Sequence, residues 1–274
     1  MEKHKTIILI VIITVIISTI GIINLNVWFD KDYENDGGIK NKTGPTEYGI
    51  AKLSKEQTRA YQNMKPDFKV GEIFEYEETM NGVDIEGSGK LIFRVDGIER
   101  MNNTDYYIVS QAMNSSFLVI DEKREKHSIE EFLEAKHYIN AETGEFLKTN
   151  REIQAIRDGI VLPKTAGETI VTEDMKQVQG NIMHFPWMLL LDESFKLEVN
   201  FKYGMGAFKE DLEVIDVDNL NGRECFKIKK RLIKDMKVID IEDIWVDKKR
   251  RILLKSDTYI DNVKTYEIKL VSKI

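Results

Sequence analysis

Cysteine is almost absent from this sequence, with a single residue, Cys225, among 274. One thiol excludes an internal disulfide framework and a zinc site built from several cysteines. It also excludes lipid attachment to a cysteine near the amino terminus, because none lies there. A domain without disulfides must be stabilised by its hydrophobic core, and apolar residues make up 42% of the chain, which is enough to form one.

The usual sequence marks of catalysis are also missing. His127, His137 and His184 have no partner at HxH or HExxH spacing, so we interpret each as a surface or helix-end histidine rather than a metal ligand. Gly87-Ser88-Gly89-Lys90 lacks the earlier glycine of a phosphate-binding loop and predicts a hairpin bend. Gly204-Met205-Gly206 lacks the third glycine of a dinucleotide fingerprint, and no serine lies in a G-x-S-x-G elbow. We predict no catalytic residue, no metal ligand and no cofactor.

Excess basic charge is absent too. Lys and Arg number 40 against 47 Asp and Glu, which gives a formal net charge of −7. The short basic runs at 227–231 and 248–251 lie among acidic residues and are typical of solvated strand ends or turns. A nucleic-acid partner is therefore not predicted.

One long apolar run is present, at residues 6–25 (TIILIVIITVIISTIGIINL), and it contains no charged residue. As a helix rising about 1.5 Å per residue, it matches a hydrocarbon core of about 30 Å. We predict a transmembrane helix that contacts the lipid bilayer. A cleaved secretion signal is the alternative, because Thr19-Ile20-Gly21 loosely imitates a cleavage site, but apolar residues continue past Gly21.

The charges on either side of this run predict its orientation. Lys3, His4 and Lys5 precede it, whereas mainly acidic residues follow it between 30 and 36. By the positive-inside rule, residues 1–5 stay in the cytoplasm and the rest of the chain lies outside. We therefore expect a single-pass cell-membrane protein with an extracytoplasmic carboxy-terminal domain.

Three regions are predicted after the span. Residues 26–49 are polar and rich in Gly, Asn and Asp, as expected of a solvated tether. Residues 50–65 contain a capping box at Ser54-Lys55-Glu56-Gln57, which predicts a short helix that ends before Pro66. Residues 66–274 form one β-rich domain.

Alternation of apolar and polar residues predicts most of that domain to be antiparallel strands with short connections. The fold class is mainly β (α+β), with a few short helices. Helices are predicted at 128–135, from a second capping box, at 151–157, with Gly159 as the stop, and at 185–191. A strand, a turn and a second strand are predicted within 138–147. Further strands are predicted at 73–79, 90–96, 106–111, 116–120, 195–203, 212–217, 225–232, 238–246, 252–260 and 263–271.

The densest apolar patch outside the span is FPWMLLL, residues 185–191. A helix of this composition is apolar nearly all round and must be covered. It is either a core helix lying across the sheet, a helix that lines an apolar ligand cavity, or one that dips toward the membrane. On the second interpretation the ligand-lining side chains are Phe185, Trp187, Met188 and Leu191.

The carboxy-terminal part resembles a known family. Leu220-Asn221-Gly222-Arg223-Glu224-Cys225-Phe226-Lys227-Ile228, then Ile244-Trp245-Val246-Asp247 and Arg251-Ile252-Leu253-Leu254-Lys255, resemble the bacterial outer-membrane lipoprotein carriers and their relatives. The resemblance is best over 212–274. It implies a strongly curved, unclosed antiparallel sheet whose concave face holds helices and an apolar cavity for acyl chains. Those carriers are soluble, whereas this chain is predicted to be anchored.

Three functions follow from these expectations. The leading hypothesis is a non-enzymatic, membrane-anchored extracytoplasmic protein that binds a lipid or other apolar ligand in a half-barrel cavity. The alternative is a structural or protein-interaction module on the cell surface, whose partner is an envelope protein. An envelope hydrolase ranks third. Acid pairs such as Glu242-Asp243 are too common at this composition to identify a glycosidase. Two distant carboxylates can still meet in a cleft.

Overall fold

The computed structural model describes residues 66–121, 123–144, 146–170, 193, 196–203, 206–234 and 236–272. These residues form one antiparallel sheet of 13 strands. The strands are β1 (Ile73–Asn81), β2 (Ile85–Met101), β3 (Thr104–Ile120), β4 (Lys126–Asn140), β5 (Phe146–Arg157), β6 (Ile160–Val161), β7 (Thr165–Ile170), β8 (Lys196–Tyr203), β9 (Gly206–Leu220), β10 (Arg223–Lys234), β11 (Lys237–Asp247), β12 (Leu253–Ile260) and β13 (Val263–Leu270).

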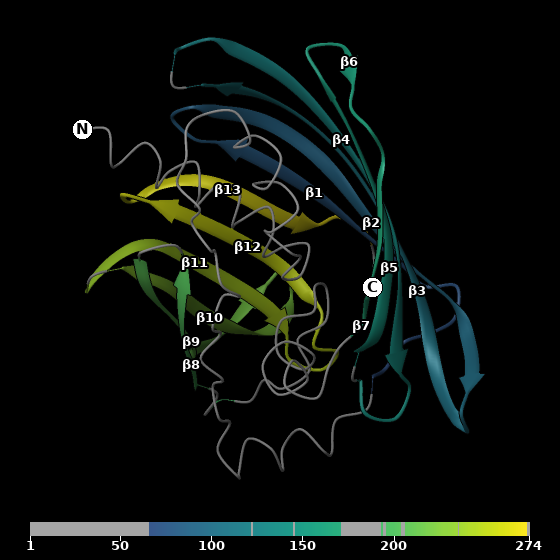
Figure 1. Ribbon diagram of the computed structural model, residues 1–274. Helices are drawn as coiled ribbons and strands as arrows, with labels where there is room; N and C mark the ends of the chain where they lie inside the picture. Colours follow the sequence, from purple (N-terminus) through teal and green to yellow (C-terminus); the bar gives the residue numbers. More distant parts are fainter. Residues whose placement is uncertain are drawn as a thin grey trace.

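The sheet consists of two meanders, β1 to β7 and β8 to β13, which meet where β1 pairs with β13; we call this pairing the central seam. The strand order is β6-β5-β4-β3-β2-β1-β13-β12-β11-β10-β9-β8, and β7 also pairs with β5. Among the described strands, only β1 and β13 join residues far apart in the sequence, with Glu78 opposite Ile268. The sheet bends strongly but does not close, since β8 ends one edge and β6 and β7 end the other (Figure 1). The unclosed antiparallel sheet and the short connections that the sequence predicts are confirmed.

Several connections reverse the chain within two residues. Both turn residues have positive φ at Asn102 and Asn103, at Asn221 and Gly222, and at Asp261 and Asn262. Asn, Asp and Gly tolerate this left-handed conformation, and it matches the right-handed twist of the flanking strands. The turns at 221–222 and 261–262 therefore lie in the gaps that the predicted strands leave, between 217 and 225 and between 260 and 263.

Alternating side chains give the sheet a buried inner face and a wetter outer face. In β1, for example, every second residue from Phe74 to Met80 is buried. The inner-face side chains of both meanders belong to one hydrophobic cluster, which includes Phe74 and Leu133 from one meander and Phe226 and Ile244 from the other. The core therefore lies on the inner side of the bend.

Two of the predicted helices are strands. Residues 128–135 belong to β4, which pairs on both sides with long neighbouring strands, and residues 151–157 belong to β5. In β4 the odd-numbered residues face inward and Leu133 is buried, so tertiary pairing overrides the local capping signal. Gly159 has a φ of +78° and ends a strand rather than a helix.

The predicted bend at 87–89 is also wrong, because these residues lie inside β2. Gly87 faces Phe117 of β3, and Gly89 lies between Glu78 and Ser115. An added Cβ at Gly89 would meet the Glu78 carboxylate and the Ser115 hydroxyl. The glycines therefore leave room for inner-face side chains of the neighbouring strands instead of turning the chain.

Several predictions fall outside the described residues. These are the transmembrane helix at 6–25, the tether at 26–49, the helix at 50–65 and the apolar patch at 185–191. Within the described ranges the chain forms no helix, and accordingly none with the length and apolar character needed to cross a bilayer.

Candidate functional site

The inner face is the candidate site, because it combines a continuous apolar surface with charged groups. Opposed residues form rows across the strands, and one such row is entirely apolar. We call it the apolar row; its side chains are buried or partly buried, and it consists of Ile153, Leu133, Met113, Leu91, Tyr76 and Leu270, from β5 to β13. The Tyr76 hydroxyl is satisfied, since it donates to the backbone oxygen of Leu253 at 3.0 Å.

Two carboxyl groups lie beside the apolar row. Glu78 and Glu131 occupy the next row, with Gly89 and Ser115 between them. The hydroxyl of Tyr266 donates to Glu78 Oε2 at 2.9 Å, and that of Ser115 donates to Oε1. Burial raises the pKa of Glu78, and burial together with the charge of Glu78 raises the pKa of Glu131. Both shifts favour the uncharged acid in this apolar setting.

A second polar cluster lies on the other meander, around Lys230. Its ammonium group lies 3.3 Å from Glu242 Oε2 and 3.7 Å from Glu210 Oε2. The Ser256 hydroxyl donates to Glu242 Oε1 at 2.6 Å. Burial alone would lower the pKa of Lys230, but the surrounding carboxylates outweigh it and raise that pKa. Lys230 is therefore charged and compensates buried acids, which include Asp240.

Asp240 makes this cluster sensitive to pH. Burial and the nearby Glu242 carboxylate raise the pKa of Asp240 to about 7. Because an unfolded aspartate titrates near about 4, the folded state holds the proton more tightly. The stabilising effect of the protonated acid is complete below about pH 4 and is lost as the pH rises through about 7.

We expect Asp240→Asn to stabilise the protein, and to do so more strongly at higher pH. Its advantage over the wild type in free energy of unfolding should grow by about 2 kcal/mol between about pH 5 and about pH 8. Urea unfolding of both proteins at the two pH values measures this. Asp216→Asn, at an exposed position on β9, is the control and should show no such growth. Equal advantages of Asp240→Asn at both pH values would contradict the raised pKa.

A third polar group on the inner face surrounds His137. This side chain is buried, so its interpretation as a surface or helix-end histidine is wrong. Burial lowers the pKa of His137 to about 4, and the ring is therefore neutral. Nε2 lies 2.9 Å from Gln111 Oε1, and Nδ1 lies 2.9 Å from Thr149 Oγ1. With Nε2–H as donor to Gln111 and Nδ1 as acceptor from Thr149, both nitrogens are satisfied.

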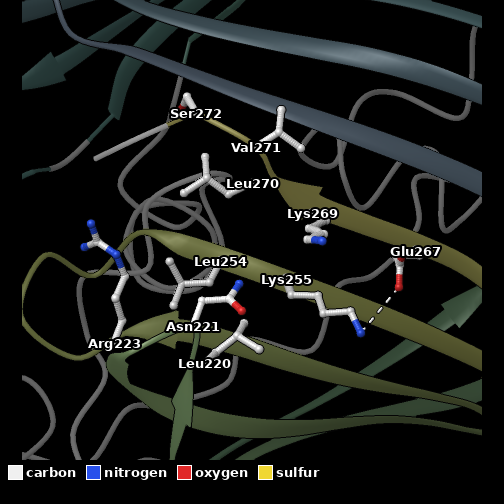
Figure 2. Close-up of a pocket in the computed structure, with 10 residues that line it drawn as sticks. All are labelled: Leu220, Asn221, Arg223, Leu254, Lys255, Glu267, Lys269, Leu270, Val271 and Ser272. Atoms are coloured by element: carbon white, nitrogen blue, oxygen red, sulfur yellow. Dashed lines mark ion pairs between the residues drawn. The ribbon is translucent and has the colours of Figure 1, made fainter.

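A hollow opens at one end of the sheet, where the β9–β10 turn, the start of β12 and the end of β13 meet (Figure 2). Its volume is about 580 Å³. Leu220 and Leu254 both line it. Figure 2 shows Lys255 paired with Glu267; this ion pair measures 3.3 Å. The lining thus mixes apolar groups with charges, among which Lys255 and Glu267 pair with each other and Arg223 lies 3.2 Å from Asp247.

His127 lies in a cluster of acids at the β3–β4 connection. Its Nδ1 is 2.7 Å from Asp158 Oδ2, and its Nε2 is 3.5 Å from Asp121 Oδ2. Ligand atoms of Asp121, Glu125 and His127 all lie within 4.8 Å of one another. The hydrogen bond that His127 donates to Asp158 is the main cause that raises the pKa of His127, and the ring lies between the Asp158 and Asp121 carboxylates.

The sequence-predicted site residues Phe185, Trp187, Met188 and Leu191 lie outside the described residues. The acid pair Glu242-Asp243 is split by the strand, since Glu242 faces Lys230 on the inner side and Asp243 pairs with Lys229 on the outer side.

Sequence reasoning missed Glu78 and Lys230. A signal was present in each case, because Glu78 follows Phe74 and Tyr76 in the buried phase of its strand, and Lys230 follows Phe226 and Ile228. A charge at an inward position of this kind marks a buried polar site.

The chain matches no protein-family model and no curated protein. Two solved structures are similar to it. One is a β-barrel-like protein of a domain of unknown function, DUF1849, from Brucella abortus, with 7% identity, a TM-score of 0.39, and coverage of 73% of this chain and 95% of that one. The other, from Bacteroides fragilis, is described as an exported protein with a YmcC-like fold, with 8% identity, a TM-score of 0.31, and coverage of 76% and 97%. Neither is named as a lipoprotein carrier, so the resemblance of residues 212–274 to that superfamily stays a prediction.

Proposed function

We propose that this protein is a membrane-anchored, extracytoplasmic, non-enzymatic domain that holds a lipid-like ligand against the inner face of its sheet. The observation that carries the proposal is the apolar row. It crosses six neighbouring strands from β5 to β13 on the concave side of a sheet that does not close. An acyl chain laid along this row would contact apolar side chains over its whole length, and each buried CH₂ would contribute about 0.8 kcal/mol.

Polar groups border the apolar row on the same face, which favours an amphipathic ligand over a purely apolar one. Glu78 and Glu131 lie in the row on one side, and Gln111 lies in the row on the other. Pockets for small molecules have this composition, with apolar walls and a few polar groups that fix orientation.

A binding role is favoured over catalysis because two acids on this face, Glu78 and Glu242, already have internal partners. Glu78 accepts hydrogen bonds from Ser115 and Tyr266, and Glu242 accepts one from Ser256 and lies next to Lys230. A general acid or base must instead present its proton to a substrate.

Photocrosslinking in cells tests the proposal on the full chain. A diazirine-bearing amino acid replaces either Met113, on the inner face of β3, or Leu118, which is 47% exposed on the outer face of the same strand. We expect irradiation to give an adduct with the mass of a lipid at position 113 and none at 118.

The result at position 113 also separates a ligand site from a solid core. Crosslinks from 113 that reach only other residues of this chain would contradict the proposal. Crosslinks from 118 to another protein, combined with that result, would favour the surface-interaction function instead.

A further inference from the structure

Arg151 has no counter-ion among the residues that the structure describes. It lies on β5 in the row next to the apolar row, opposite Ala135 on β4. Its Nη1 atom is shielded from solvent and has no hydrogen-bond partner in the described part of the chain. Burial is the only cause that shifts the pKa of Arg151, and it lowers that pKa, which agrees with the lack of a nearby carboxylate.

Arg151 is partly buried, so its unpaired guanidinium loses part of its hydration without gaining a counter-ion from the described residues. Moving a charge out of water requires compensation by an opposite charge or by several hydrogen bonds. Arginine stays protonated in proteins, so neutralisation does not relieve the cost. An acceptor that the described residues do not supply would relieve it.

A second unsatisfied donor lies in the same row. Gln111 on β3 is opposite Ala135, so Arg151, Ala135 and Gln111 form three successive members of the row. Gln111 is 5% exposed, and none of the described residues forms a hydrogen bond with its Nε2. His137 fixes the amide by donating to its Oε1 at 2.9 Å, which leaves the Nε2 protons available.

The neighbours of Arg151 leave space for an acceptor. Ala135 separates the two donors and has only a methyl group. On the other side, Gly167 of β7 lies opposite Arg151, and a Cβ added there would meet nothing within 4 Å. Two donors thus flank a position without a bulky side chain.

This position adjoins the apolar row. Ile153 follows Arg151 by two residues on β5, and Leu133 precedes Ala135 by two on β4, so both point to the same face. A molecule with its head at Arg151 would have its chain directed along Ile153, Leu133 and Met113 toward the central seam.

We propose that Arg151 and Gln111 bind the anionic head of the ligand, a carboxylate or a phosphate joined to an acyl chain. The inference rests on the proposed function and specifies its ligand class. A guanidinium binds both groups in bidentate fashion, and the Gln111 amide adds a third hydrogen bond.

Three photoreactive probes with the same diazirine-bearing chain test this on the full-length protein in phosphatidylcholine nanodiscs: a fatty acid, a lysophosphatidic acid and a fatty alcohol. We expect the acid or the phosphate to label the apolar row at least about 10-fold more strongly than the alcohol, the effect of one charge-assisted hydrogen bond of about 1.5 kcal/mol or more. The stronger of the two anionic probes identifies the head group.

Substitutions then assign the effect to Arg151. Arg151→Gln should reduce labelling by the anionic probe to the level of the alcohol, whereas Arg151→Lys should keep part of it. Arg94→Gln is the matched control. Arg94 lies on β2 of the same meander and pairs with Asp96 at 2.5 Å, so this substitution should leave the labelling unchanged. Because the wild-type guanidinium is uncompensated, Arg151→Gln should also melt no lower than the wild type without ligand.

The outcomes separate the two proposals. Labelling of the apolar row by all three probes equally, or an anionic preference that survives in Arg151→Gln, overturns the inference but leaves the proposed function standing. Absence of row labelling by every probe overturns the proposed function itself. A lower melting temperature of ligand-free Arg151→Gln would show that Arg151 is structural and would also overturn the inference.

Discussion

Gly87→Ala is expected to destabilise the protein by about 3 kcal/mol, the upper end of the range for overpacked cores. A Cβ on Gly87 would lie 2.5 Å from the backbone oxygen of Ser116 and 2.6 Å from the Cα of Phe117. These are backbone atoms of β3, so relief requires the two strands to move apart rather than a side chain to rotate. Urea unfolding followed by circular dichroism measures the loss.

Gly97→Ala is the matched control in the same strand. A Cβ at Gly97 meets nothing within 4 Å. Its substitution should change the free energy of unfolding by no more than about 0.5 kcal/mol. If Gly87→Ala were as stable as Gly97→Ala, the pairing of Gly87 with Phe117 in β2 and β3 would be wrong.

Lys230→Met should have the second large effect, a destabilisation of about 3 to 5 kcal/mol at neutral pH. Lys230 is 8% exposed, and its removal leaves the partly buried Glu210, Glu242 and Asp240 without their cation. The three acids then repel one another when ionised. The loss should therefore be smaller at about pH 5, where Asp240, with its pKa raised to about 7, is protonated and the repulsion is weaker.

The adjacent residue provides the control for this prediction. Lys229 faces the outer side, where it lies 3.5 Å from Asp243 and its side chain is 29% exposed. Lys229→Met should cost at most about 1 kcal/mol, as for other surface ion pairs. Equal effects at 229 and 230 would show that the two side chains do not differ in burial, and would contradict the assignment of Lys230 to the inner face.

The strands of the second meander were predictable because their local signals agree with one another. From residue 206 to 270 the apolar alternation is regular, and pairs such as Asn221-Gly222 and Asp261-Asn262 mark the reversals. Local pattern and tertiary pairing give the same answer there. The predicted bounds accordingly lie close to those of β10 to β13.

The first meander was harder because its local signals compete with its pairing. Ser128 to Glu131 has the form of a helix cap, yet no helix follows it. The backbone N–H of Ser128 instead donates to Asp158 Oδ1, at the turn between β5 and β6. Glycines such as Gly87 and Gly89 are typical of turns, but both lie within a strand. A Cβ at Gly87 would collide with Phe117, and a Cβ at Gly89 would collide with Glu78. These partners lie roughly 10 to 30 positions away, beyond the reach of any local pattern.

By itself, the sequence determined the β class, the antiparallel meander and most of the reversals, because alternation and turn chemistry act between residues close in the chain. Only the tertiary structure decided that β1 pairs with β13 and that Arg151 and Gln111 share one row. Strand register fixes which distant side chains face one another, and a shift of one residue would turn each of them to the opposite face. The candidate site therefore exists only in that register, which brings its side chains to the same face.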